Sequence, residues 1–472
     1  MKLRASATGR RSTATGKLLA TTAVSLLSLS SFPCCDAFAP PARLHARHNL
    51  HPSAARPTVS AYQGSSGLID ISAPDSTRDV YAMEQWAAEY GMQKAPGVEL
   101  YTADGADWQL VTQAPIAAGS SVLYVPSDIV LGSNAVQQEL GGSLEAAENA
   151  LVQMEQGLQA RLPLFRLMVK ILAEWDAGAE SPYFYWLNSL PRQFYNGVAM
   201  TDACFECLPP YAALLSMNER NAYSRFVNAI RKGFVPLNQN TVNDDRIVKW
   251  AYNVALTRFH EVWDPVRQKF IAPMADLLNH AAEPNCEIQF DPQGNCYVTS
   301  LYDIAPGSPL TVSYGDPTNP TPLFAKFGFL PMDCATVFCK AVHLESQIAE
   351  LGYEYKDLLF QTETGEIAPK VWDIFLYELL QNNDPDSANA FYQACISNDE
   401  GTKQQYHDHY FQYTLDSLKN HVYELLASVD QLNYKAQSYD LETHPRVPVI
   451  LAHNNLVRDT FSKTYALLEQ MG

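Results

Sequence analysis

Chemistry-bearing residues in this 472-residue chain concentrate between positions 258 and 330, in two polar segments. The first segment reads APMADLLNH and ends in Asn279-His280, and the second reads LTVSYGD around Tyr314-Gly315. We expect Asn279 and His280 to lie where a strand gives way to a loop, offering hydrogen-bond donors and acceptors. Tyr314 falls at a strand end, and the glycine beside it lets another group approach the backbone closely. Together these side chains can bind and orient a polar reactant.

Each of these residues also has a purely structural interpretation. Tyr314 alone could be an ordinary strand tyrosine, and His280 alone could be a hydrogen-bonded core or loop histidine. Asp276 and His280 lie four residues apart and could ligate a metal from one helix face. No third ligand follows at a suitable spacing, so we predict no metal site. The lone pair Cys204 and Cys207 precedes Leu-Pro-Pro instead of a helix, which favours two ordinary thiols.

The order of the motifs favours the functional interpretation. The Asn-His pair, the turn at 304–307, the Tyr-Gly pair and the Phe-Gly-Phe of 327–329 closely resemble the paired C-terminal motifs of SET-domain methyltransferases. Asn279-His280 matches the Asn-His signature of that family, and the VSYG around Tyr314 matches the motif that carries its active-site tyrosine. The ADLLNH form, a long helical insert, the segment 181–191 and the helical tail resemble the Rubisco large-subunit methyltransferase group within the family.

This resemblance implies an S-adenosylmethionine-dependent protein methyltransferase, with a lysine side chain as the favoured acceptor. It implies that the backbone at Asn279 and His280 holds the adenine edge of the cofactor, while the Asn279 side chain holds its amino-acid part. Arg258 matches an arginine near the cofactor's carboxylate, and Asp276 is assigned to the same cofactor-binding set. Tyr314 is the residue expected to line the methyl-transfer channel. The apolar walls of the substrate channel are assigned to Phe327 and Phe329, with Phe324 as a further candidate.

Methyl transfer from a sulfonium makes physical demands that these residue types meet. The reaction is an in-line displacement, so the protein mainly positions two reactants and fits their charge distribution. The C–H groups of a sulfonium methyl suit a ring of oxygens supplied by backbone carbonyls and a tyrosine hydroxyl. The attacking nitrogen must be uncharged, and a narrow, desolvated channel favours the neutral amine.

Two positions depart from the family pattern. SET enzymes normally carry Gly-x-Gly before the first strand pair, whereas here Gly105 is followed by Asp107 and Trp108. Asp107 could pair with the cofactor's ammonium, and Trp108 would bring a large side chain to the pocket rim or block the site. Phe327 replaces a tyrosine of many relatives, which removes one oxygen near the amine. The alternative function is therefore a catalytically inactive SET-like protein-binding module, and methylation of a histidine or an N-terminal amine stays open as well.

The elements that must position these residues alternate between strand-rich and helix-rich blocks. Helices are predicted at 80–90, 135–156, 162–175, 218–231 and 245–259, and strands at 108–113, 121–125, 287–290, 296–301 and 309–314. In the first helix, Tyr81, Trp86 and Ala87 are apolar at helical spacing, which places them on one buried face. We therefore predict an α+β fold, with a SET domain of short β-sheets at 78–340 and a helical insert at about 135–260. An all-α substrate-binding domain is predicted at 341–472, where His407-Asp408-His409 would form solvated helix surface.

The first 68 residues look like targeting sequence. We exclude residues 1–68 from the fold; of these, 1–37 have a basic start and then a short apolar run, as a signal peptide does. Residues 38–68 begin Phe-Ala-Pro and contain arginine and serine but no acid, as transit peptides do. Together they resemble the bipartite plastid presequence of algae with secondary plastids, such as diatoms. We therefore expect a plastid protein, most naturally in the stroma, although a secreted protein with a basic N-terminus is an alternative.

The remaining charge and cysteines narrow the choice of partners. The chain carries a formal charge of −18, but its first 68 residues are basic and the remainder carries −25. Such an acidic body repels phosphate backbones, so we expect no nucleic-acid partner. No other apolar run approaches a membrane span, and seven cysteines outside the presequence imply no disulfide framework. We expect a monomer that acts on a protein substrate, with the Rubisco large subunit and plastid aldolase as the candidates suggested by the family.

Overall fold

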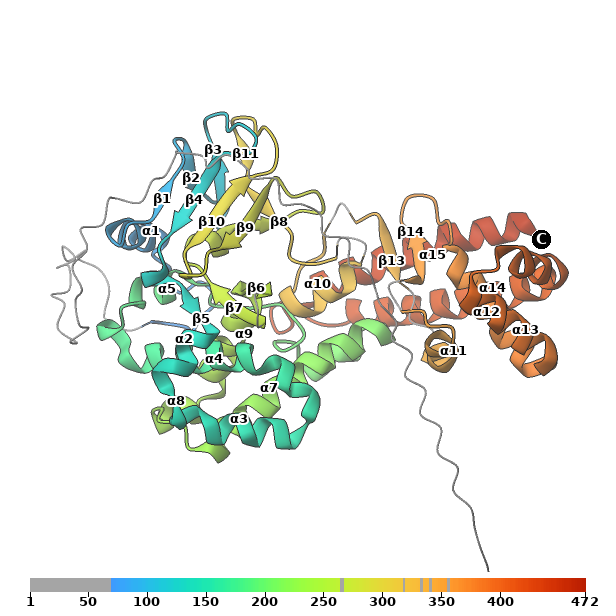
Figure 1. The fold of residues 1–472 in the computed structure, drawn as a ribbon, viewed down its shortest axis with the longest axis horizontal. Coiled ribbons are helices and arrows are strands. Elements are labelled where there is room, and N and C mark those ends of the chain that lie inside the picture. The colour runs from blue at the N-terminus through green and yellow to red at the C-terminus, as the bar shows by residue number, and fades with distance from the viewer. Residues whose placement is uncertain (1–68, 264–266, 317–318, 332–333, 339–341, 355–356) are drawn as a thin grey trace, which may run out of the picture. The chain divides into compact units, whose positions relative to one another are not determined.

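The computed structural model of the protein describes residues 69–263, 267–316, 319–331, 334–338, 342–354 and 357–472 (Figure 1). The predicted signal peptide at 1–37 and the transit-like segment at 38–68 lie outside these ranges. Across the described part of the chain, no helix is both long enough and apolar enough to traverse a bilayer.

The strands form several short sheets that combine segments from before and after the helical insert. A four-stranded antiparallel sheet has the order β1-β4-β10-β9, and two three-stranded sheets have the orders β11-β3-β2 and β5-β7-β6. The strands are β1 (Gln93–Lys94), β2 (Val98–Tyr101), β3 (Gln109–Thr112), β4 (Ser121–Val125), β5 (Leu131–Gly132), β6 (His260–Trp263), β7 (Arg267–Ile271), β8 (Asn279–His280), β9 (Cys286–Phe290), β10 (Cys296–Ser300), β11 (Ser308–Pro309) and β12 (Thr311–Val312). The strand predicted at 309–314 is thus two shorter strands, β11 and β12, which pair with different partners.

The predicted helices are present, with corrections at two places. The helices before and within the insert are α1 (Val80–Glu89), α2 (Ser133–Leu140), α3 (Gly142–Met154), α4 (Leu162–Ala177), α5 (Phe184–Ser189), α6 (Asp202–Phe205), α7 (Pro210–Gly233), α8 (Gln239–Asn243) and α9 (Asp245–Arg258). The single helix predicted at 135–156 is two helices, because Gly141 adopts a positive φ of 47° between them. The second correction concerns Tyr81, which helical spacing placed on the buried face of α1 but which is 61% exposed.

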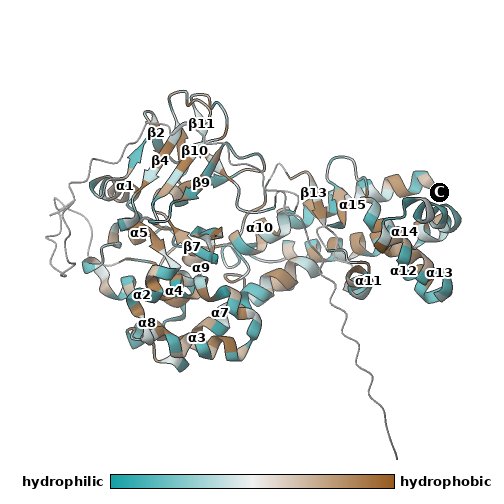
Figure 2. Ribbon diagram, viewed as in Figure 1, coloured by the Kyte–Doolittle hydropathy of each residue, from teal (hydrophilic) through white to brown (hydrophobic). Residues whose placement is uncertain are grey.

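One hydrophobic cluster holds the sheets and the insert together. It includes Trp186, Phe165, Phe226 and Tyr252, all fully buried, with the Phe165 and Phe226 rings edge-on at 5.2 Å between centroids. The helices carry both apolar and polar residues in Figure 2, as expected when one side of each is buried. This core fixes α9, and therefore Arg258 at its end, against the strands that follow.

In its described residues, the C-terminal region is helical apart from one two-stranded antiparallel sheet. Its helices are α10 (Pro320–Phe327), α11 (Glu345–Glu350), α12 (Pro369–Asn383), α13 (Pro385–Ser397), α14 (Glu400–Gln437) and α15 (Val447–Met471). Strands β13 (Thr336–Phe338) and β14 (Leu359–Gln361) pair antiparallel across the boundary predicted at 340. The expectation of an all-α region is therefore corrected by β14, while a second hydrophobic cluster of this region comes mainly from its helices.

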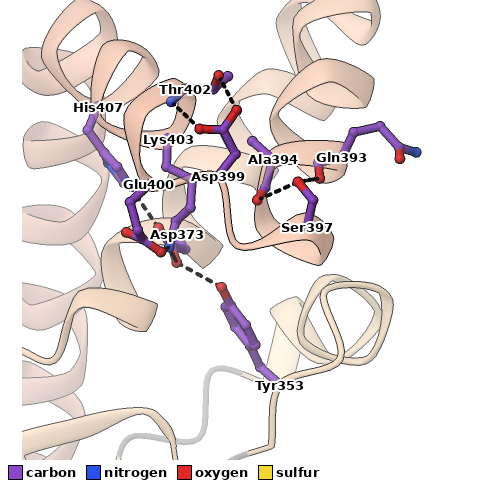
Figure 3. Close-up of polar contacts among 10 residues, drawn as sticks. All are labelled: Tyr353, Asp373, Gln393, Ala394, Ser397, Asp399, Glu400, Thr402, Lys403 and His407. Atoms are coloured by element: carbon purple, nitrogen blue, oxygen red, sulfur yellow. Dashed lines mark hydrogen bonds and ion pairs between the residues drawn. The ribbon is translucent and has the colours of Figure 1, made fainter.

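A buried carboxylate ties three C-terminal segments together (Figure 3). Asp373 on α12 contacts His407 Nε2 at 2.8 Å and Lys403 Nζ at 2.9 Å, both from α14, and accepts a 2.8 Å hydrogen bond from Tyr353 Oη. Burial alone would raise the pKa of Asp373, but the hydrogen bonds from His407, Lys403 and Tyr353 outweigh it and hold the pKa below its ordinary value. The prediction that His407 is solvated surface is wrong, because α12 packs against that side of α14.

Candidate active site

Two segments separated by about thirty positions in the sequence lie side by side at the site. Strand β8 pairs parallel with β12, so that Thr311 lies opposite Asn279 and Val312 opposite His280. Just beyond the pairing, the backbone N–H of Tyr314 donates to His280 Nδ1 at 3.1 Å. Because Nδ1 accepts, the neutral His280 ring carries its hydrogen on Nε2. The Asn-His and Tyr-Gly motifs predicted to act together are therefore joined by backbone pairing and by a direct hydrogen bond.

The Tyr314 hydroxyl is held in one orientation. It donates a 2.6 Å hydrogen bond to the backbone carbonyl of Leu278. Burial raises the pKa of Tyr314 to about 12, and although Arg258 opposes the shift, Asp276 adds to it. The hydroxyl therefore stays protonated at neutral pH. Since its proton is used on Leu278, its oxygen can act only as an acceptor toward any other group.

Aromatic rings surround this hydroxyl. The Tyr314 and Phe327 ring centroids lie 4.8 Å apart, and Phe329 contacts both Tyr314, at 6.1 Å, and His280, at 5.9 Å. Gly328 ends α10 in the left-handed conformation, with φ 84°, and the chain then places Phe329 at the site. Only glycine fits at this position, because a Cβ there would lie 2.5 Å from the Tyr195 backbone. The two phenylalanines assigned to the substrate channel thus lie beside Tyr314.

Phe324, the third phenylalanine considered as a wall, lies elsewhere. It is fully buried, and its ring centroid lies 4.7 Å from that of His453 on α15. It belongs to a small core shared with the C-terminal helices. The assignment of Phe324 to the channel is therefore wrong. Helix α10 buries Phe324 in the core, and only the C-terminal end of this helix reaches the site.

Two cavities meet at Tyr314. One, of about 810 Å³, is lined by the 104–108 loop and by Asn279 and Phe329; we call it the Asn279 cavity. The other, of about 740 Å³, is lined by residues of α9, β6, β7 and β9 and by Lys326; we call it the Lys326 cavity. The residues that line both are Thr257, Arg258, Asp276, Tyr314 and Phe327. A ligand in each cavity would therefore face the other across Tyr314 and Phe327.

Arg258 and Asp276 form the floor between the two cavities. The Arg258 guanidinium donates to the Asp276 backbone carbonyl at 2.6 Å and lies 3.7 Å from its carboxylate. The same carboxylate accepts a 3.0 Å hydrogen bond from Trp186 Nε1, and its side chain is only 1% exposed. Burial raises the pKa of Asp276, and Arg258 and Trp186 oppose that shift. Both predicted residues thus line the site, with Asp276 committed to holding Arg258 and Trp186.

The Asn279 cavity contains two arginines that the sequence did not single out. Arg78 Nε donates to the Ser189 carbonyl at 2.8 Å, and a second nitrogen bonds the Ala106 carbonyl. Arg192 Nη2 donates to the Thr77 carbonyl at 2.6 Å. Burial, and then repulsion from Arg258 and Arg192, lowers the pKa of Arg78 to about 10. No local pattern marks these arginines, because they reach Arg258 only through the packing of α1 and α5.

The loop that replaces Gly-x-Gly leaves the cavity open. Trp108 Nε1 donates to the Gly105 carbonyl at 3.1 Å, and its ring packs edge-on against Tyr81 with centroids 5.2 Å apart. Trp108 therefore forms part of the cavity wall, held by the exposed Tyr81. Asp107 lines the same wall, where burial and Asp104 raise its pKa while Arg258 and Arg78 oppose the shift. The 105–108 loop thus presents a carboxylate next to a group of guanidiniums.

The alternative chemistries considered from the sequence gain no support here. Among the residues that the structure describes, no three His, Cys, Asp or Glu side chains are placed to hold a metal ion. Cys204 and Cys207 are free, buried thiols in the small core shared by the insert, α10 and the C-terminal helices.

Comparison with known proteins agrees with this geometry. Residues 107–315 match the family model described as SET domain. The structure of Rubisco LSMT bound to AdoMet shares its fold with a TM-score of 0.55 at 12% identity, over 83% of this chain and 92% of that one. The SET domain of LSMT bound to lysine and AdoHcy does so with a TM-score of 0.56 at 13% identity, over 83% of this chain and 91% of the other.

A relative found by sequence matches a smaller part. SET domain-containing protein 4 of Artemia parthenogenetica is 23% identical over 175 residues, which are 35% of this chain. They are 43% of the relative, so the chain matches less than half of that protein's length. The predicted α+β class, with a SET domain and a helical C-terminal region of the Rubisco LSMT type, is confirmed at the level of the fold.

Proposed function

We propose that this protein is an S-adenosylmethionine-dependent protein methyltransferase whose acceptor is a lysine side chain. The observation that carries the proposal is the meeting of two cavities at a protonated, oriented Tyr314 hydroxyl. The match to the SET domain and the fold shared with LSMT structures bound to AdoMet, lysine and AdoHcy support it.

The residues of the Asn279 cavity fit S-adenosylmethionine. The carboxylate of the cofactor's amino-acid part suits the guanidiniums of Arg78 and Arg258, whose charges are only partly compensated. The ammonium of the same part suits the Asp107 carboxylate. Asn279 lines the same cavity, and its Nδ2 lies 3.4 Å from Gln109 Oε1. His280, the next residue of β8, lines neither cavity, and its Nδ1 accepts from the Tyr314 N–H instead. When bound, the cofactor supplies a methyl group activated by a sulfonium.

The chain's own residues then position the acceptor. Tyr314 offers an acceptor oxygen at the junction, oriented by Leu278, and suits the partly positive C–H groups of a methyl in flight. Phe327 and Phe329 exclude water around it, which favours the neutral amine that must attack. Asp276 is a positioning residue, since it holds Arg258 and Trp186 in place.

A calorimetric titration of S-adenosylmethionine into the purified full chain tests the proposal. We expect micromolar binding that weakens at least about tenfold in Asn279→Ala, because one polar partner of the ligand is lost. Lys232→Gln is the matched control, since Lys232 is exposed on α7 and lies outside both cavities. A folded protein that fails to bind millimolar cofactor would overturn the enzymatic function and favour the inactive protein-binding module, which the altered 105–108 loop suggests.

We further propose that the protein acts in a plastid, where the Rubisco large subunit and aldolase are the first substrates to test. The support is the composition of residues 1–68 and the fold shared with Rubisco LSMT. A fluorescent protein fused behind residues 1–68, expressed in an alga with secondary plastids, should accumulate within the plastid. Fluorescence in the medium or the secretory pathway alone would contradict this location.

A further inference from the structure

The Lys326 cavity is rich in cations although the chain as a whole is acidic. Its lining holds five cationic side chains against four carboxylates, and burial lowers the pKa of His260 there to about 4, which keeps that ring neutral. The cations are Arg161, Arg258, Arg267, Lys269 and Lys326, and the carboxylates are Glu219, Glu261, Asp276 and Glu287. The ion pairs between these cations and carboxylates show which cation has no carboxylate partner.

Three of the carboxylates are committed to cations other than Lys326. Arg161 binds Glu219 through two hydrogen bonds of 2.7 and 2.8 Å. Glu261 binds Arg267 and, at 2.7 Å, Lys269, while Asp276 faces Arg258.

The fourth carboxylate, Glu287, is exposed on β9 and accepts a hydrogen bond from Gln289. Within the described ranges, Lys326 Nζ has no ion pair and no hydrogen bond. It is therefore the cation of this cavity that lacks a partner.

Lys326 is held instead by aromatic faces. Its Nζ lies 4.2 Å from the ring centroid of Phe259 and 4.5 Å from that of Phe327, and Lys269 Nζ approaches the Phe259 ring as well, at 3.5 Å. Burial, followed by repulsion from Lys269, lowers the pKa of Lys326 to about 8. A partly buried ammonium without a counterion is unfavourable, and an arriving anion would relieve that cost.

Lys326 lines the Lys326 cavity but not the Asn279 cavity. The charges that act on Tyr314 are Arg258, Asp276 and Asp107. Those that act on Lys326 are Lys269, Glu219, Glu261 and Arg161. Lys326 thus lies next to the place where the proposed function puts the protein substrate.

We propose that Lys326 is a specificity-determining residue that binds the carboxylate of an aspartate or glutamate close to the methylated residue of the substrate protein. This inference rests on the proposed function, because that function assigns the Lys326 cavity to the substrate. Phe259 and Phe327 would pack against the methylene groups of the acidic side chain while Lys326 meets its charge. Lys269, already paired with Glu261, adds favourable potential.

Binding of two matched peptide pools to the full chain tests this without requiring turnover. Both pools are short fluorescent peptides with one central lysine; one has randomised flanks containing Asp and Glu, the other Asn and Gln at the same positions. We expect the acidic pool to bind about tenfold more tightly, as one charge-assisted hydrogen bond provides. Lys326→Gln should reduce the preference to within about twofold, and Lys326→Arg should retain it. Lys232→Gln, at an exposed site outside the cavity, should leave it unchanged.

The possible outcomes separate this inference from the proposed function. Equal binding of the two pools, or an acidic preference that survives Lys326→Gln, overturns the role of Lys326 even if S-adenosylmethionine binds normally. A chain that fails to bind S-adenosylmethionine overturns the proposed function, whereas the pool preference still reports on the cavity. A thermal unfolding measurement checks that the variant is folded. Lys326→Gln should unfold at a temperature at least as high as the natural chain, because the substitution removes an unpaired charge.

Discussion

Replacing Arg258 with methionine separates its structural role from its binding role. The guanidinium bonds the Asp276 backbone and is the only cation 4 Å or less from the Asp276 carboxylate among the described residues, at 3.7 Å. That carboxylate is 1% exposed, so Arg258→Met leaves a buried charge whose remaining partners, Trp186 and backbone N–H groups, are neutral. Removing one member of a buried pair costs about 3–5 kcal/mol, and the remaining bond to Trp186 places the expected loss of unfolding free energy at about 3 kcal/mol.

The second variant in this test neutralises the stranded charge. Asp276→Asn in the Arg258→Met background should recover most of the lost unfolding free energy, measured by urea denaturation, because no unpaired charge remains. The affinity for S-adenosylmethionine should stay at least about tenfold weaker in both variants, since neither has the guanidinium that meets the carboxylate. A double variant as unstable as Arg258→Met alone, or one with restored cofactor affinity, would refute this reasoning.

Three further predictions follow from other residues. Asp373→Asn should lower the unfolding free energy by about 3 kcal/mol in thermal or urea denaturation, because Lys403, His407 and Tyr353 lose their shared anionic partner; an unchanged midpoint would contradict the role of this cluster. Burial lowers the pKa of His260, His421 and His453 from 6.5 to about 4. Between pH 6.5 and pH 4, these histidines are therefore protonated in the unfolded chain but neutral in the folded one. Stability should be fully present above that range and fall by about 1.4 kcal/mol per pH unit for each histidine as the pH drops through it, and a flat urea midpoint from pH 7 to 4.5 would be inconsistent with these neutral rings. Phe327→Tyr should reduce the number of methyl groups transferred per acceptor, seen by mass spectrometry, because the added hydroxyl takes up space beside Tyr314; an unchanged product pattern would place Phe327 outside the channel.

Local features of the fold were predictable because short-range rules decide them. The strand at 121–125 coincides with β4, and the helix predicted at 245–259 begins after Asp244, whose side chain accepts from the Arg246 N–H as a cap. Nonlocal features were not predictable in this way. The parallel pairing of β8 with β12, which places Asn279 near Tyr314, became predictable only through the ordered motifs of a family.

The errors have a common physical cause. His407 was expected on a solvated face, and Tyr81 on a buried one, because helical spacing defines a face without saying what packs against it. Arg78 and Arg192 could not be found, since an arginine becomes part of a site only through the tertiary contacts that bury it. Phe324 and Phe327 lie one turn apart on α10, and only the packing of α15 assigns the first to the core.

The most direct test of the central claim is methyl transfer by Tyr314→Phe. The full chain is incubated with tritium-labelled S-adenosylmethionine and soluble protein from plastid-bearing algal cells, and label in protein lysine is counted. We predict transfer by the natural chain and a loss of about hundredfold or more in Tyr314→Phe, with cofactor affinity within a few-fold, because the hydroxyl acts on the moving methyl and not on the bound cofactor. Equal transfer by the variant would contradict the role assigned to Tyr314 and the mechanism built on it.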